Sequence, residues 1–69
     1  MIFVFKTSVE TKLQVQQLQP HIDTMVPNAA WNFDLQDCDK ILRIESEENI
    51  VLTIIHLLKM NNFICEELE

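Results

Sequence analysis

The stretch that most constrains the fold is residues 30–44, in which apolar and polar residues alternate. Trp31, Phe33 and Leu35 occupy every second position, with polar residues between them. A period of two places all three side chains on one face of a strand and the polar side chains on the other. After a polar turn, Leu42 and Ile44 continue the pattern. The stretch therefore predicts a β-hairpin with one buried face.

The length of the chain, 69 residues, leaves room for one small domain, which we assign to residues 1–69. A domain of this size buries only roughly 60% of the surface that its unfolded chain exposes, so few large apolar residues can be spared from the core. Hydrophobic residues make up 48% of the chain and charged residues 23%, as in a folded globular protein. A multidomain enzyme is excluded.

The first segment, residues 2–5, is a continuous apolar run and predicts a central strand covered on both sides or nearly so. A helix is then predicted over residues 8–25. Thr7 and Glu10 have the spacing of a capping box, and Ser8 is a second candidate N-cap. Pro20 removes a backbone donor, so we expect a distortion there. The expected buried face, at spacings of three and four, is Val15, Leu18, Ile22 and Met25.

A second helix is predicted after the hairpin. Ser46 is its candidate N-cap, and Glu47 and Glu48 would lie in its first turn, where the helix dipole favours negative charge. The apolar pattern continues as far as Lys59 or Met60. The expected buried face is Val51, Ile54, Ile55 and Leu58.

The end of the second helix is predicted at Asn61 and Asn62, because asparagine can adopt the left-handed conformation that glycine usually supplies. Residues 63–68 then form the last strand. The order is strand, helix, strand, strand, helix, strand. Two right-handed crossovers joining four strands predict an α+β, ferredoxin-like βαββαβ sandwich: a four-stranded antiparallel sheet with both helices on one face.

This architecture, at this length, resembles the heavy-metal-associated (HMA) domain of copper chaperones and metal-transporting ATPases. Asn61, Asn62 and Phe63 stand where that family commonly has Gly-Tyr before its last strand. The hairpin sequence is also similar to that of small bacterial proteins of unknown function related to this superfamily. The resemblance implies the fold over the whole chain, whereas activity does not follow from a shared fold.

The HMA family carries Met-x-Cys-x-x-Cys in the loop before its first helix, followed four residues later by a buried aliphatic residue. With Val15 at that aliphatic position, Ser8 and Thr11 occupy the cysteine positions, so the Cys-x-x-Cys motif is absent. Copper(I) and zinc chaperoning needs soft thiolates, which neutral hydroxyl groups do not replace. We expect these two residues to cap the helix and not to bind metal.

The predicted hairpin turn contains the remaining metal candidates. Cys38 lies between Asp37 and Asp39, whose charges disfavour a thiolate. Together with Asp34, these carboxylates offer oxygen ligands, but a calcium site needs six or more oxygens. We expect a solvated turn. Metal binding by Cys38 and nearby carboxylates, or by a site shared between two chains, remains the alternative function.

The other reactive side chains do not assemble a site by spacing. Cys65 shares strand parity with Phe63 and is expected to face the helices as a small buried hydrophobe. His21 and His56 have no carboxylate or cysteine at ligand spacing, and surface or partly buried histidines are expected. The chain has no glycine, which excludes a Walker-type loop, a dinucleotide fingerprint and a nucleophile elbow. We predict no catalytic, cofactor-binding or metal residues, and no enzyme activity.

The net charge of -6 indicates the kind of partner. The 5 Lys and Arg residues form no stripe, so nucleic acid and anionic membranes are poor partners and a basic protein surface is the better one. No apolar run suits a signal peptide or a membrane span, so we expect a cytoplasmic protein with reduced cysteines. The carboxylates gather in three places: Asp34, Asp37 and Asp39; Glu45, Glu47 and Glu48; Glu66, Glu67 and Glu69.

One face of the predicted sheet is left without helices. Two alternate residues of the first strand must point toward this face, near Ile41 and Arg43. The resulting apolar patch, rimmed by charge, suits a partner or a homodimer. The leading hypothesis is thus a non-catalytic cytoplasmic binding module. The two candidate pairs are Ile2 with Val4 and Phe3 with Phe5.

Overall fold

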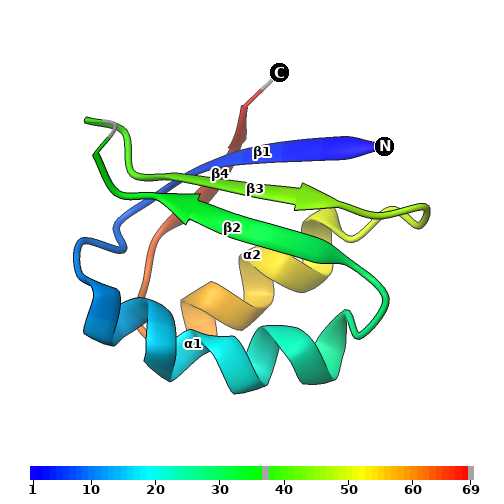
Figure 1. Cartoon of the computed structure of the whole chain (residues 1–69), viewed down its shortest axis with the longest axis horizontal. Helices are drawn as coiled ribbons and strands as arrows, with labels where there is room; N and C mark the ends of the chain where they lie inside the picture. Colours follow the sequence, from blue (N-terminus) through cyan, green and yellow to red (C-terminus); the bar gives the residue numbers. More distant parts are fainter. Residues whose placement is uncertain (37, 69) are drawn as a thin grey trace.

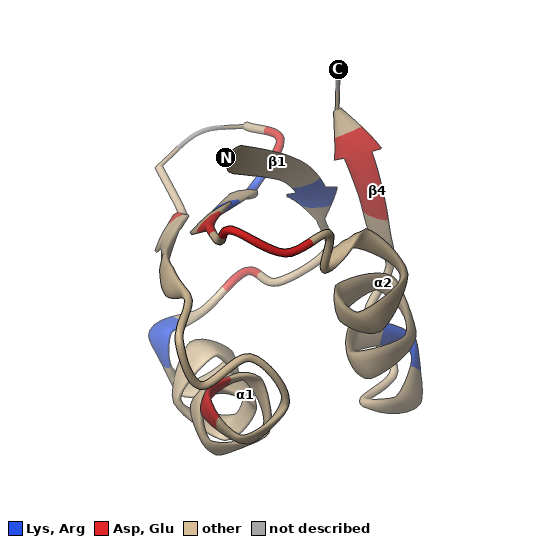
Figure 2. Cartoon of the chain, turned by 90° about the vertical axis from the view of Figure 1, so that its right-hand side faces the viewer, with Lys and Arg blue, Asp and Glu red and all other residues tan. Residues whose placement is uncertain are grey.

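The computed structural model describes residues 1–36 and 38–68 and has the predicted ferredoxin-like α+β arrangement (Figure 1). The sheet is antiparallel with strand order β2-β3-β1-β4. Both helices lie under one face of it, as the view along the strands also shows (Figure 2). The elements are β1 (Ile2–Thr7), α1 (Lys12–Met25), β2 (Ala30–Asp34), β3 (Ile41–Glu45), α2 (Val51–Met60) and β4 (Cys65–Leu68).

The core lies between the sheet and the helices, and the strand register explains which residues enter it. Phe5 of β1 pairs with Leu42 of β3, which pairs with Phe33 of β2. Two residues along, Ile44 stands between Phe3 and Trp31 in the same way. The hairpin prediction is therefore confirmed: its alternating apolar residues face the helices. The fully buried core side chains are Phe5, Val9, Leu18, Ile22, Leu42, Ile44, Ile54 and Leu58.

The start of α1 was predicted wrongly. Thr11 is the N-cap: its Oγ1 accepts from the Gln14 N–H at 3.1 Å, while the Gln14 Oε1 accepts from the Thr11 N–H at 3.2 Å. Thr7 and Ser8 do not cap α1, because Thr7 is the last residue of β1 and Ser8 pairs with Ile64, just before β4. The Ser8 N–H donates to the Ile64 carbonyl at 3.0 Å, and the Ile64 N–H donates to the Ser8 Oγ at 2.8 Å. This contact joins residues 56 apart in sequence. Because of it, the helix starts at Lys12, about one turn later than predicted.

The far end of α1 also differs from the prediction at one core position. The helix continues through Pro20 to Met25, and Leu18 and Ile22 are fully buried as predicted, with Val15 packed beside them. Met25, however, is 56% exposed, and Val26 takes the last core position. Val26 has left helical geometry, with φ at -133°, so the chain turns and brings position 26 inward instead of 25.

The α2 helix begins later than predicted. Its first residue is Val51 and its N-cap is Ile50, so Ser46 does not cap it and Glu47 and Glu48 lie before it. Ser46 closes a local turn instead, its Oγ accepting from the Glu48 N–H at 3.2 Å. Of the predicted apolar face of α2, Ile54 and Leu58 are buried in the core, and Val51 and Ile55 are partly buried against it. Leu57, which was not predicted, is also buried.

The end of α2 confirms the role of the asparagine pair. Asn62 has φ of 69°, and its N–H donates to the Lys59 carbonyl at 3.0 Å. The Phe63 N–H reaches the Leu58 carbonyl at 2.8 Å, which completes a Schellman motif. The last strand begins at Cys65, two residues later than predicted, because Phe63 is still part of this cap.

Candidate functional site

The candidate site is the open face of the sheet, on the side away from both helices. It is formed by the residues that alternate with the core residues, so their positions follow from the register. Ile2 and Val4 are the pair of β1 residues on this face, which the sequence left undecided. The expectation of a first strand covered on both sides is therefore wrong. The open face comprises Ile2, Val4, Lys6, Ala30, Asn32, Asp34, Ile41, Arg43, Glu45, Glu66 and Leu68.

An apolar strip crosses the open face from β1 to β4. Val4 is half-buried and stands opposite Leu68, which is 36% exposed, while Ile2 is 68% exposed. Ile41 differs, because it is 5% exposed although it does not belong to the core cluster. Its register neighbours, Lys6 and Asp34, flank it on the same face. The strip available to a partner is therefore Ile2, Val4 and Leu68.

Both cations of the open face lie close to carboxylates. The Lys6 Nζ is 3.8 Å from the Asp39 Oδ1, and the Arg43 Nη1 is 3.9 Å from the Asp34 Oδ2. Exposed pairs of this kind add at most about 1 kcal/mol to stability. Their larger effect is on the charge of the face, which they neutralise locally.

Two further carboxylates make the rim of the strip acidic. Glu45 stands opposite Ile2, and Glu66 stands opposite Lys6. The acidic residues of β4 and of the segment before α2 are red in Figure 2. Carboxylates thus outnumber the two cations around the strip.

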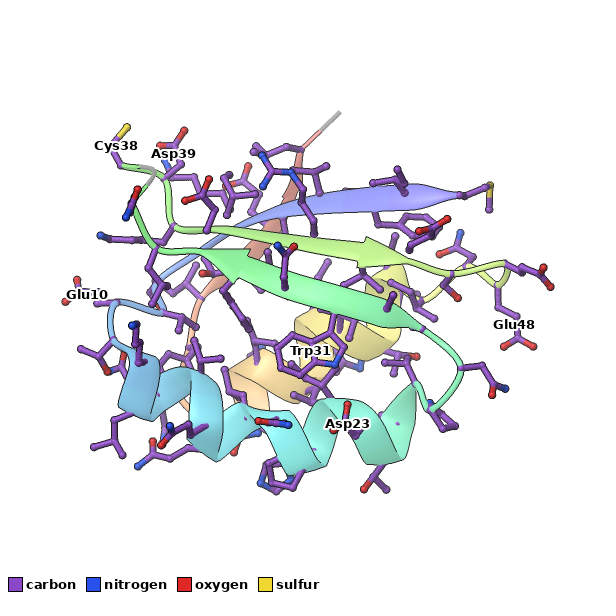
Figure 3. All side chains as sticks on the ribbon, in the orientation of Figure 1. Glu10, Asp23, Trp31, Cys38, Asp39 and Glu48 are labelled. Carbon is purple, nitrogen blue, oxygen red and sulfur yellow. The ribbon has the colours of Figure 1, made fainter. Side chains whose placement is uncertain are left out.

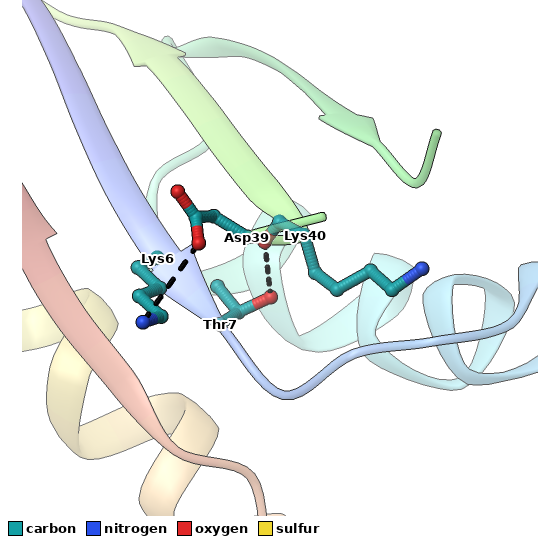
Figure 4. A network of polar contacts seen from close by, with 4 residues as sticks. All are labelled: Lys6, Thr7, Asp39 and Lys40. Carbon is teal, nitrogen blue, oxygen red and sulfur yellow. Dashed lines mark hydrogen bonds and ion pairs between the residues drawn. The ribbon is translucent and has the colours of Figure 1, made fainter. Parts of the chain in front are cut away.

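A second network attaches the hairpin turn to the end of β1 (Figure 4). The Thr7 Oγ1 donates to the Lys40 carbonyl at 2.7 Å, beside the Lys6–Asp39 ion pair. Lys40 has a positive φ of 52°, and its Nζ donates to the Leu35 carbonyl at 3.0 Å. These contacts give the turn a structural role, which the charge pattern of the sequence did not indicate.

The hydroxyl groups at the HMA cysteine positions both have structural partners. Ser8 binds the backbone of Ile64, and Thr11 caps α1. The expectation of helix capping is correct for Thr11 and wrong for Ser8.

The thiols have different surroundings. Cys38 is exposed at the hairpin turn, where Figure 3 shows it beside Asp39. Cys65 is half-buried and packs against the core, as its strand parity predicted, and burial raises the pKa of its thiol from 9.0 to about 12. Asp37, the third carboxylate of the turn, lies outside the described residues, as does Glu69. Across residues 1–36 and 38–68, no three His, Cys, Asp or Glu side chains come together as a metal site. His21 and His56 are exposed.

The structure contains a hollow that sequence reasoning missed. Its volume is about 740 Å³, and it lies at the end of the sheet where β2 begins and β3 ends. Met1 and Met25 contribute to its wall, together with Glu45, Glu47 and Glu48. It forms because segments 25–30 and 45–50 meet only in the tertiary structure. Glu45 belongs both to this hollow and to the open face.

A groove beside β2 was also not predicted. It runs between α1 and β2, and its apolar wall is formed by Val15, Trp31, Phe33 and Leu35. The Trp31 Nε1 donates to the Asp23 Oδ1 at 3.0 Å, which joins the two elements (Figure 3). As the hairpin pattern predicted, these aromatic residues lie on the core side of the sheet. They are only half-buried because β2 lies at the edge of the sheet.

Comparisons of the chain with protein-family models, with curated proteins and with solved structures found no match. Among the residues that the structure describes, no helix has the length and apolar character needed to cross a membrane.

Proposed function

We propose that this chain is a non-catalytic, cytoplasmic protein-interaction module that binds a basic surface of another protein through its open face. The observation that carries the proposal is the apolar strip between carboxylates, in which Ile2 and Leu68 are exposed and Val4 is half-buried. The free cysteines Cys38 and Cys65 support a reducing compartment. We also propose descent from an HMA-like domain without its metal loop, which the ferredoxin-like order supports.

The apolar strip supplies the binding free energy in this proposal. Fully burying an aliphatic side chain is worth about 1.5–3 kcal/mol. Ile2 has most of its surface available for this, and Val4 and Leu68 retain part of theirs. Because the β-strands already fix the backbone of these residues, only their side-chain rotamers are ordered when a partner covers them.

The carboxylates supply the preference for a basic partner. Lys6 and Arg43 already have Asp39 and Asp34 nearby, so the field around the strip is set by Glu45 and Glu66. Complementary charge speeds encounter and rejects wrong partners more than it adds affinity. Its effect weakens as salt shortens the Debye length, which is about 8 Å at physiological ionic strength.

The proposal is tested by affinity capture with matched variants. Wild type, Val4→Lys and Leu52→Lys are used as baits in extract of the native cells, and the captured proteins are identified, purified and titrated. Leu52 is 71% exposed on α2, so its variant carries the same charge change away from the open face. We expect a basic partner whose affinity falls by at least about tenfold for Val4→Lys and stays within about twofold for Leu52→Lys.

Charge reversal provides the second arm of this experiment. Glu45→Lys should lower the affinity for the same partner and reduce the salt dependence of the association rate. Equal affinity of the purified partner for wild type, Val4→Lys and Glu45→Lys would contradict the proposal.

A further inference from the structure

The two edges of the sheet differ in how they are protected against pairing with another strand. β4 has four residues, and two of them, Glu66 and Glu67, are charged. β2 has five residues, Ala-Trp-Asn-Phe-Asp, with no lysine or proline and with one charge at its end. Short length and charged side chains are the usual devices that block edge pairing. β4 is therefore protected by its short length and its two charges, whereas β2 has only the one charge at its end.

From this difference we propose that two copies of the chain pair through their β2 strands, antiparallel, around a two-fold axis at Asn32. The proposal does not depend on the proposed function, because it uses the edge of the sheet and leaves the strip of Ile2, Val4 and Leu68 uncovered. The two sheets would join into one of eight strands. The two open faces would then form one continuous surface.

The sequence of β2 is self-complementary in this register. All five residues find a partner: Asn32 stands opposite Asn32 of the second copy, and Trp31 stands opposite its Phe33. Ala30 stands opposite Asp34, so no like charges face each other. Trp31 and Phe33 already contact each other edge to face within one chain, with ring centroids 5.8 Å apart. The two-fold axis would extend this contact into a cluster of four half-buried rings.

The charges beside β2 are complementary under the same symmetry. Lys12, at the start of α1, lines the groove near Phe33 and Asp34. Asp23, near the other end of α1, binds Trp31 at the opposite end of β2. Figure 1 shows that α1 runs antiparallel to β2 beneath the edge. In the proposed dimer, the two-fold axis therefore brings Lys12 of each copy toward Asp23 of the other. Two opposite-charge pairs would then flank the rings.

Sedimentation equilibrium of the full chain over a range of concentrations tests the dimer. We expect wild type to associate reversibly, and Asn32→Lys, which places two like charges opposite each other at the axis, to weaken association by at least about tenfold. Glu67→Lys is the matched control on the other edge and should change it by less than about twofold. Circular dichroism confirms that each variant is folded.

Disulfide trapping tests the register. In a Cys38→Ser background, Asn32→Cys should form a covalent dimer under mild oxidation, because opposed Cα atoms in an antiparallel pair are about 4.5–5.5 Å apart, within disulfide range. Ala30→Cys should not, because the two new thiols would lie four residues out of register.

Two results would overturn the proposal. One is a wild type that stays monomeric up to about 1 mM. Its free energy of dimerisation would then be weaker than about 4 kcal/mol. The other is a dimer that Val4→Lys disrupts and Asn32→Lys does not, which would place self-association on the open face. Neither result changes the affinity test of the proposed function, so the two proposals can fail separately.

Discussion

The two faces of the sheet are built from the same strands, yet neighbouring residues on them have opposite environments. On β1, Phe5 is fully buried under the helices, while Val4 is half-buried on the open face and Ile2 is 68% exposed. On β3, Leu42 and Ile44 are fully buried, while Arg43 is exposed between them. A period of two separates the residues that pack under the helices from those on the face without helices.

The largest difference is expected for truncation of one β1 residue on each face. Phe5→Ala should lower the free energy of unfolding by about 3–5 kcal/mol, because it leaves a cavity in a dry core. Val4→Ala removes fewer buried contacts and should cost about 1 kcal/mol. Urea unfolding at one protein concentration measures both. Equal losses would mean that the open face is covered in solution.

The thiols extend the comparison to reactivity. With a pKa of about 12, Cys65 carries about a thousandfold less thiolate at neutral pH than a thiol of pKa 9.0. We expect an alkylating reagent to modify Cys38 first and Cys65 much more slowly. Mass spectrometry of the intact chain measures both rates. Urea should remove the difference. Equal rates in the native protein would contradict the burial of Cys65.

The same thiol gives a pH dependence of stability. Because its pKa is higher in the folded chain, its contribution is complete below pH 9 and is lost as the pH rises through 12. Wild type should therefore lose stability relative to Cys65→Ala over this range. Other groups that titrate there are common to both proteins, so they cancel in the difference. A constant difference would show that the thiol is solvated.

A smaller effect is expected at the helix cap. Thr11→Ala should lower the free energy of unfolding by about 1 kcal/mol, since it removes the acceptor for the Gln14 N–H. Thr7→Ala tests the alternative cap from the sequence pattern. It removes the hydrogen bond to the Lys40 carbonyl and the one accepted from the Val9 N–H, both of which lie outside α1. Amide hydrogen exchange separates the two, because only Thr11→Ala should deprotect the first turn of α1.

The smallest effect is expected at the open face itself. Lys6→Ala breaks the exposed ion pair with Asp39 and should change the free energy of unfolding by less than about 1 kcal/mol. Repeating the measurement in 1 M salt should reduce even this difference. A loss of several kcal/mol would mean that the pair is buried against another surface, such as a second copy.

Local patterns were sufficient for much of the fold. The alternation of Trp31, Phe33 and Leu35 located the hairpin, and the asparagines after Met60 located the end of α2, because both signals depend on residues close together in sequence. The helix starts were missed because both candidate caps have partners far along the chain. Ser8 contacts Ile64, and the Ser46 N–H donates to the Met1 carbonyl at 2.9 Å. The candidate site was half predicted: an apolar pair on the open face was expected, but which pair was not.

What the sequence determined by itself is the order of elements, the alternation within each strand and the acidic charge, all of which depend on spacing along the chain. Only the tertiary structure decided that Ile2 and Val4 face away from the helices, that Lys6 meets Asp39, and that β2 keeps an unpaired edge. The reason is physical: a period of two gives a strand two faces, and the side that becomes core depends on where the helices pack. That choice is made by contacts between residues far apart in sequence.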